Sequence, residues 1–277
     1  MKKKSVDIII FVLLLIMAVI FVAPVLIIVM NSFKGRFFIS DTPFKLPDSA
    51  SFVGLENYVS GLAKTGFFSS FGYSLLITVL SVAVIVLCTS MTAWYIQRHK
   101  NAFTKTLFYA FIFSMIVPFQ MVMFTLSTLT NRLGLDNPIG IVPIYLGFGA
   151  GLSVFLFSGF VKSVPVSIEE AAAIDGCSES KMFFSVVFPM LTPIAVTVAI
   201  LNAMWIWNDY LLPSLVLDKM KYKTIPVAVQ SLRGSYGSVD MGAMMAMLVL
   251  SILPIIIFYL TSQKQIIKGV AAGAVKG

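Results

Sequence analysis

The side chains that could do chemistry in this chain fall into two groups. One is a patterned polar stretch over residues 162–193, and the other is a set of polar residues inside otherwise apolar runs. The sequence has no phosphate-binding loop of the form Gly-x-x-x-x-Gly-Lys-Ser/Thr, so we expect any ATP to be hydrolysed by another chain. The single histidine, His99, lies between Arg98 and Lys100, and we interpret it as a solvated loop residue. We predict no catalytic set and no metal site.

The polar stretch is too polar to span a membrane, and its spacing predicts two short helices. Pro165 supplies a rigid start, and Ser167 and Glu170 have the spacing of a capping box. In such a box the hydroxyl accepts from the Glu170 backbone N–H, and the carboxylate accepts from the N–H of the cap. Three alanines follow, and alanine favours the helix most strongly. We therefore expect a helix from about Ile168 to Ile174.

The dipeptide Asp175-Gly176 predicts the end of this first helix, because glycine adopts a positive φ without a Cβ clash. Ser178 is placed to cap a second short helix, whose apolar residues lead to Pro189. The sequence therefore predicts two short helices joined at a glycine, at the surface of a membrane.

Membrane helices must position these groups, because the chain is too apolar for a soluble domain. Of its 277 residues 58% are hydrophobic and 12% are charged, which is about half of the usual charged fraction. We predict an all-α membrane protein with a single domain over residues 1–277. A helix needs about 20 apolar residues to cross the bilayer. Six runs qualify, at about 8–30, 71–96, 107–129, 139–161, 187–212 and 241–260.

The basic residues predict the orientation of these helices. Three lysines precede the first apolar run, which is longer than the roughly 7–15 residues of a signal peptide core, so we interpret it as a retained helix. If the N-terminus is cytoplasmic, 11 of the 20 Lys and Arg residues lie inside, in the shorter segments. Both termini and the loop 162–188 are then cytoplasmic. The net charge of +8 is explained by this topology and by lipid contact, without nucleic acid. Cys88 and Cys177 form no disulfide framework.

The polar stretch resembles a signature of bacterial ABC importers. That signature reads Glu-Ala-Ala, three residues, Gly, nine residues, an aliphatic residue, any residue, and Leu-Pro. Here it stands as Glu170-Ala171-Ala172, then Gly176, then Val186-Val187-Phe188-Pro189, with Phe188 in place of leucine. The chain end from Gln263 to Gly277, and Trp207-Asn208-Asp209-Tyr210 with Pro213, look like carbohydrate permeases of the maltose-transporter class.

The resemblance implies the function and the partners. The chain would be a permease subunit, not an enzyme, in a bacterial inner membrane, paired with a second permease chain as a heterodimer. Two cytoplasmic ATPase subunits would bind ATP and Mg, and an extracytoplasmic sugar-binding protein would deliver the substrate. The loop 162–188 would dock on an ATPase subunit and transmit its closure to the membrane helices. The residues implied in that coupling are Ser167, Glu170, Ala171, Ala172, Asp175, Gly176 and Pro189. Which sugar is carried stays open.

Polar groups at membrane depth are costly and often functional, so some of them are candidates for the substrate path. For each candidate the alternative is helix–helix hydrogen bonding or an interfacial aromatic belt, which we favour. The candidates are Gln120, Asn202, Trp207, Asn208, Asp209 and Tyr210.

Two rival functions remain for the whole chain. One is a secondary transporter or a channel that ATP does not drive. Its only support is Asp209, the one acid well inside an apolar run, and no cation accompanies that acid in the sequence. The other is a membrane scaffold without transport, which would leave the patterned loop unexplained.

Overall fold

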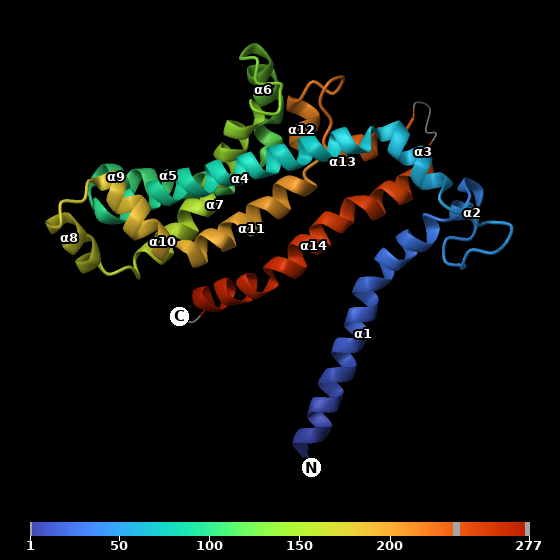
Figure 1. Ribbon diagram of the computed structural model, residues 1–277, viewed down its shortest axis with the longest axis horizontal. Coiled ribbons are helices and arrows are strands. Elements are labelled where there is room, and N and C mark those ends of the chain that lie inside the picture. The colour runs from blue at the N-terminus through green and yellow to red at the C-terminus, as the bar shows by residue number, and fades with distance from the viewer. Residues whose placement is uncertain (1, 235–238, 275–277) are drawn as a thin grey trace. The chain divides into compact units, whose positions relative to one another are not determined.

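The computed structural model describes residues 2–234 and 239–274, with side chains over residues 7–234 and 239–263. Within this part of the chain every regular element is a helix, and the only β-type pairings are two isolated bridges (Figure 1). The all-α prediction is confirmed. The chain divides into two compact units, residues 1–70 with 227–256 and residues 71–226 with 257–277. The single domain expected over residues 1–277 stays a prediction.

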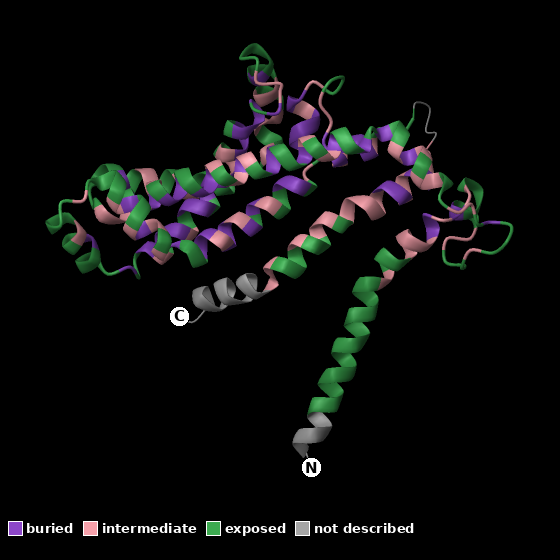
Figure 2. Ribbon diagram, viewed as in Figure 1, coloured by how far each residue is buried: buried purple, intermediate pink, exposed green. Residues whose placement is uncertain are grey.

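The first unit begins with a long apolar helix. Its side chains are exposed from Asp7 to Val22 (Figure 2). An apolar helix without cover is stable only in lipid or against another protein, which agrees with a membrane span. The helices that belong wholly or in part to this unit are α1 (Lys2–Asn31), α2 (Arg36–Asp41), α3 (Glu56–Thr65), the first turn of α4 (Phe67–Arg98), α13 (Ile225–Gln230) and α14 (Met241–Ala274).

Helix α3 is tied to its neighbours in the first unit by polar contacts. The Asn57 side chain donates to the backbone oxygens of Ser32 and Lys34, both at 2.8 Å. Lys64 forms an ion pair with Asp240, which precedes α14. Burial raises the pKa of Asp240, but hydrogen bonds from Lys64 and from a backbone N–H outweigh it and hold that pKa below its usual value.

The second unit is built around helix α7 (Ile141–Val161). In the most apolar stretch of α7, 61% of the residues are buried, against 33% in that of α4 (Phe67–Arg98). Helix α7 also contacts both α5 and α11. The fully buried side chains include Tyr145 and Phe157. The other helices of this unit are α5 (Ala102–Ile116), α6 (Phe119–Arg132), α8 (Val166–Ile174), α9 (Glu179–Met182), the π-helical turn η1 (Phe183–Val187), α10 (Phe188–Met190), α11 (Thr192–Asn208) and α12 (Leu211–Val216).

The continuous helix expected over residues 107–129 is corrected to two helices. The pair α5 and α6 is bent by 101° at the break between them. Proline cannot donate a backbone hydrogen bond, and it forces the residue before it out of the helical region. Val117 accordingly has φ −74° and ψ 114°, and Pro118 begins the new helix direction.

The expected helix over residues 187–212 is also broken. The segment Glu179–Met190 and helix α11 are bent by 79° relative to each other, and α11 ends at Asn208. Four helices of the described chain are long and apolar enough to cross a membrane, and the number rises to six if each bent pair is one span. The six predicted spans therefore correspond to four single helices and two bent pairs.

Candidate coupling site

Helix α8 begins at Val166, two residues earlier than the sequence predicts. Its N-cap is Pro165, with φ −63° and ψ 128°, and no side chain caps the first turn. Ser167 lies inside the helix, so the capping box expected from Ser167 and Glu170 is wrong. The reason is that Pro165 has no N–H to satisfy and its fixed φ already suits the entry to a helix. A capping box does form elsewhere, between Asn101 and Thr104 at the start of α5.

The predicted end of α8 at Asp175-Gly176 is confirmed. Gly176 has φ +78°, in the left-handed region that favours glycine. The N–H of Gly176 donates to the Ala173 oxygen, and that of Cys177 donates to the Ala172 oxygen, both at 3.0 Å. This pair of bonds is a Schellman motif, which satisfies the last carbonyl groups of the helix. The turn is therefore fixed by backbone bonds, with Asp175 at the C-cap.

The second short helix is also present. Ser178 is its N-cap, and the hydroxyl accepts a hydrogen bond from the Lys181 N–H at 3.4 Å. The turn η1 follows, and its buried Phe183 packs against Trp94 of α4 and against Phe188. The predicted pair of short helices joined at a glycine is confirmed, and α9, η1 and α10 lead into the bend before α11.

A buried ion pair holds α8 to the end of α4. The Arg98 guanidinium donates to both carboxylate oxygens of Glu169, with the shortest contact at 2.6 Å. The Trp94 indole N–H donates to the same carboxylate at 3.0 Å. The Arg98 Nη2 atom also donates to the backbone oxygen of Val164. Glu169 is thus fully partnered, as a buried carboxylate must be.

Sequence reasoning missed this group of three residues. Glu169 adjoins Glu170, and the sequence alone does not say which carboxylate faces the protein. In the sequence, Arg98 serves only as one of the basic residues that predict the orientation of the membrane helices. One signal was available, because Trp94 and Arg98 are four residues apart and so share one face of a helix. Both are the kind of donor that a buried carboxylate needs.

The outer face of α8 is unusual for a surface helix. Glu169 is its only buried residue, whereas Val166, Ile168 and Ile174 are exposed, Ile174 by 86%. A surface helix normally turns its apolar side chains toward the protein and its charges toward water. Helix α8 instead buries the charged Glu169 and exposes its large apolar side chains, while Glu170 and Ala171 are also exposed and Ala172 is half-buried. It lies at one end of α4 and α7, where its exposed face is available to another molecule (Figure 1).

The structure scatters the candidate path residues. Gln120, Asn208 and Tyr210 are exposed, whereas Trp207 is buried and packs on Phe71. Asn208 donates to a backbone oxygen of its own helix. A cavity of about 420 Å³ between α4, α5 and α7 is lined by none of the six candidates.

Two of these residues join helices. The Asn202 amide donates to the Ser153 hydroxyl at 3.2 Å and so connects α11 with α7. The Tyr145 hydroxyl donates to Asp209 at 3.1 Å, and Asp209 also accepts from two backbone N–H groups at the start of α12. These contacts are those of helix packing, which is the alternative that we favour from the sequence.

The comparisons with known proteins agree on one family. Residues 85–271 match the family described as "Binding-protein-dependent transport system inner membrane component". A probable starch degradation products transport system permease protein of Thermoanaerobacterium thermosulfurigenes is 37% identical over 95% of this chain and 94% of its own length. A multiple sugar-binding transport system permease protein of Streptococcus mutans is 36% identical over 96% of each chain.

A solved structure shares the fold. It is the crystal structure of a bacterial ABC transporter involved in the import of the acidic polysaccharide alginate, with a TM-score of 0.80 and 23% identity over 95% of this chain and 97% of that chain. The family match covers residues 162–188 and most of the second unit. This chain belongs to the family of binding-protein-dependent transport system inner membrane components.

Proposed function

We propose that this chain is the membrane-spanning permease subunit of an ATP-driven importer of a sugar or oligosaccharide, and that α8 docks on a separate ATPase subunit. The observation that carries the proposal is the reversed burial of α8. Its one buried residue is a charged one, and its exposed face carries Val166, Ile168 and Ile174. Apolar side chains on an exposed helix face are typical of a surface that another protein covers.

The anchoring of α8 gives a docked ATPase two routes into the membrane helices. One route is the ion pair of Arg98 with Glu169, which connects α8 to α4. The other is the chain itself, which runs through α9, η1 and α10 into α11. Coupling over a distance needs packed, rigid elements of this kind. Closure of the ATPase subunits would move α4 and α11 and so expose the substrate path alternately to the two sides.

The names of the relatives support a sugar substrate. They include transport permeases for starch degradation products, for multiple sugars, and for melibiose, raffinose and stachyose. A solved relative is described in complex with an alginate pentasaccharide-bound periplasmic protein. By the same reasoning we propose a second permease chain, two ATPase subunits that hold ATP and Mg, and an extracytoplasmic sugar-binding protein as partners. The setting is a bacterial inner membrane, with both termini and residues 162–188 in the cytoplasm.

Affinity purification of the tagged chain in mild detergent tests the proposal. We expect an ATPase subunit and a second permease chain to co-purify, and ATP hydrolysis to come only from the complex. Ile174→Asp should release the ATPase and keep the second permease chain, because it places a charge on the docking face without touching the chain's own packing. Ile139→Asp is the matched control, since Ile139 is 70% exposed and lies outside the loop.

Two results would contradict the proposal. One is ATP turnover by the isolated chain, free of other ATPases. The other is sugar uptake by the chain alone in vesicles with an ion gradient, which would favour the secondary transporter.

A further inference from the structure

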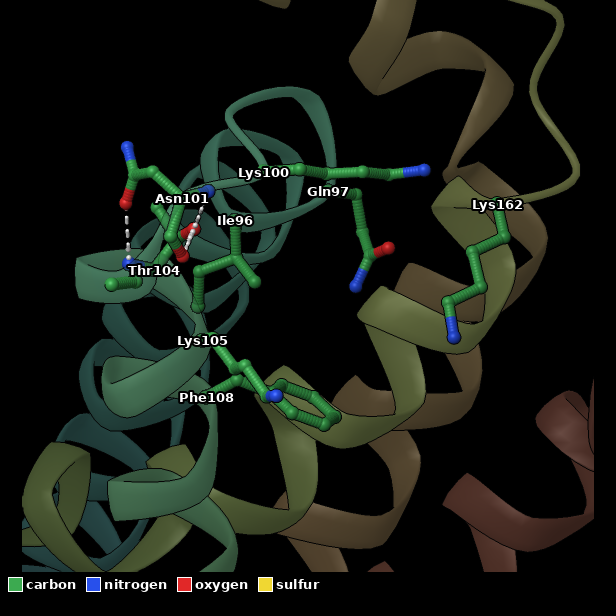
Figure 3. Close-up of a pocket in the computed structure, with 9 residues that line it drawn as sticks. Ile96, Gln97, Lys100, Asn101, Thr104, Lys105, Phe108 and Lys162 are labelled. Carbon is green, nitrogen blue, oxygen red and sulfur yellow. Dashed lines mark hydrogen bonds between the residues drawn. The ribbon is translucent and has the colours of Figure 1, made fainter.

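A second cavity lies at the same end of the second unit as α8, and none of the preceding functions uses it. It has a volume of about 510 Å³ and opens between the end of α4, the start of α5 and the end of α7 (Figure 3). The residues that line it include Ile96, Gln97, Lys100, Lys105, Phe108 and Lys162.

The lining of this cavity is strongly basic. Lys100, Lys105 and Lys162 come from three different segments, and their side chains border the same space (Figure 3). No carboxylate is among the lining residues, and none of the ion pairs found in the described part of the chain includes one of these lysines. Arg98, which lies between two lining residues, is already occupied by Glu169. Three ammonium groups around one space repel one another, and a bound anion would relieve that repulsion.

The backbone of the cavity is fixed before any ligand arrives. The Asn101 side chain accepts from the Thr104 N–H at 2.9 Å, and the Thr104 hydroxyl accepts from the Asn101 N–H at 3.1 Å. Thr104 is buried and its hydroxyl donates to the backbone oxygen of His99, so the turn between α4 and α5 is held at both of its ends. A preformed site of this kind loses little conformational entropy when a ligand binds.

The apolar part of the cavity identifies the kind of anion. Ile96 and Phe108 line the space next to the lysines. Beyond them α5 exposes Tyr109 and Phe113, which lie four and eight residues after Lys105 and so continue the same face of the helix. A free phosphate has no use for such a surface, whereas the acyl chains of a lipid do. Basic pockets between helix ends on the cytoplasmic side of a membrane bind anionic headgroups.

We propose that this cavity binds the headgroup of an anionic phospholipid, with its phosphate among Lys100, Lys105 and Lys162 and its acyl chains along α5. That the cavity faces the cytoplasmic leaflet rests on the orientation in the proposed function. The binding itself depends only on the cavity and its charges. A lipid held there would also fix the turn that carries Arg98, the anchor of α8.

Native mass spectrometry of the full-length chain, released from nanodiscs, tests this site. The discs contain phosphatidylcholine alone or with phosphatidylglycerol, and bound lipids are counted. The test variant carries Lys100→Gln, Lys105→Gln and Lys162→Gln. The matched control carries Lys219→Gln, Lys221→Gln and Lys223→Gln, which removes the same charge from a segment that hydrogen-bonds near the other end of α7 through Asp218 and Asp136.

We expect the wild-type chain and the control to retain phosphatidylglycerol over phosphatidylcholine, and the test variant to lose this preference. Each lysine contributes about fivefold to the affinity, so the three together contribute on the order of 100-fold. Equal retention by the test variant and the control would overturn the proposal. Displacement of the lipid by excess inorganic phosphate would also overturn it, because the ligand would then be a free anion. In the affinity purification described above, loss of the ATPase subunits by a test variant that keeps its lipid would overturn it too, because the cavity would then be a protein interface.

Discussion

The Arg98 guanidinium and the Glu169 carboxylate meet at 2.6 Å, and their side chains are only 15% and 8% exposed. This contact joins α8 to α4 across 71 positions of the sequence. It makes Glu169 the inward-facing residue of α8, and so it turns the apolar residues of that helix outward. The orientation of the exposed apolar face of α8, which we propose docks on an ATPase subunit, therefore depends on a buried ion pair.

Glu169→Gln is expected to loosen α8, because it leaves Arg98 charged and without its carboxylate. Breaking a buried ion pair by removing one partner costs about 3–5 kcal/mol. The rate at which the Cys177 thiol reacts measures the loosening, in a Cys88→Ser background and without ATPase subunits. Glu170→Gln is the matched control, since Glu170 is adjacent and exposed. We expect the rate to rise at least about tenfold for Glu169→Gln alone. Equal rates in the two variants would show that the ion pair does not hold the helix.

The double variant Arg98→Met with Glu169→Leu should be less damaged than either single variant. Replacing both members of a buried pair by apolar residues is often neutral, because no charge is left without a partner. Co-purification of the ATPase subunit with each variant gives the measurement. A double variant that loses the ATPase as completely as the worse single variant would mean that the charges act on the partner directly.

The packing between α7 and α11 predicts a contrast between two glycines. An added Cβ at Gly149 would lie 2.8 Å from Asn202 Oδ1 and 2.8 Å from Ile85 Cδ1, whereas one at Gly147 would meet nothing within 4 Å. Gly149→Ala should therefore cost about 1–3 kcal/mol of stability, and Gly147→Ala should be tolerated. Thermal unfolding in detergent measures the difference. Similar midpoints for the two variants would mean that the helices do not pack in this way.

Asn202→Ala separates helix packing from a role in the substrate path. Its hydrogen bond to Ser153 lies between helices, and such bonds are worth about 0.6 kcal/mol on average. We expect a small loss of stability and an unchanged substrate range in an uptake assay. Abolished uptake with normal stability would place Asn202 on the path instead.

The orientation predicts where Cys177 reacts. With residues 162–188 in the cytoplasm, a membrane-impermeant thiol reagent should label Cys177 in inverted vesicles and leave it unlabelled in whole cells, again with Cys88 replaced. Labelling from outside the cell would reverse the topology.

The sequence predicted what local physics decides. Glycine at a positive φ, serine at an N-cap and long apolar runs each need only neighbouring residues, and Gly176, Ser178 and the apolar helices agree with them. The cap of α8 was predicted wrongly because Pro165 and Ser167 compete for the same role, and spacing does not say which one prevails.

Long-range pairing lay beyond such reasoning. The partner of Glu169 is 71 residues away, and only the fold shows that Arg98 reaches it. The proline break at Pro118 was visible in the sequence, but the angle between α5 and α6 depends on what each helix packs against. The candidate path residues could not be assigned from the sequence either. A polar group at membrane depth looks the same in sequence whether it contacts a substrate or a neighbouring helix.

The central claim is that the loop around Gly176 couples the ATPase to transport, and a pair of glycine variants tests it most directly. Gly176 has φ +78° and Gly134 has φ +65°, and an added Cβ meets nothing within 4 Å at either position. Valine should therefore cost the same local strain of about 1–2 kcal/mol at both sites. Only Gly176 lies in the loop. In proteoliposomes with the sugar-binding protein and ATP, we measure the sugar imported for each ATP hydrolysed. The account predicts that Gly134→Val keeps the wild-type ratio, whereas Gly176→Val inserts normally but loses the ATPase or hydrolyses ATP without uptake. A wild-type ratio and a full complement of ATPase in Gly176→Val would contradict it.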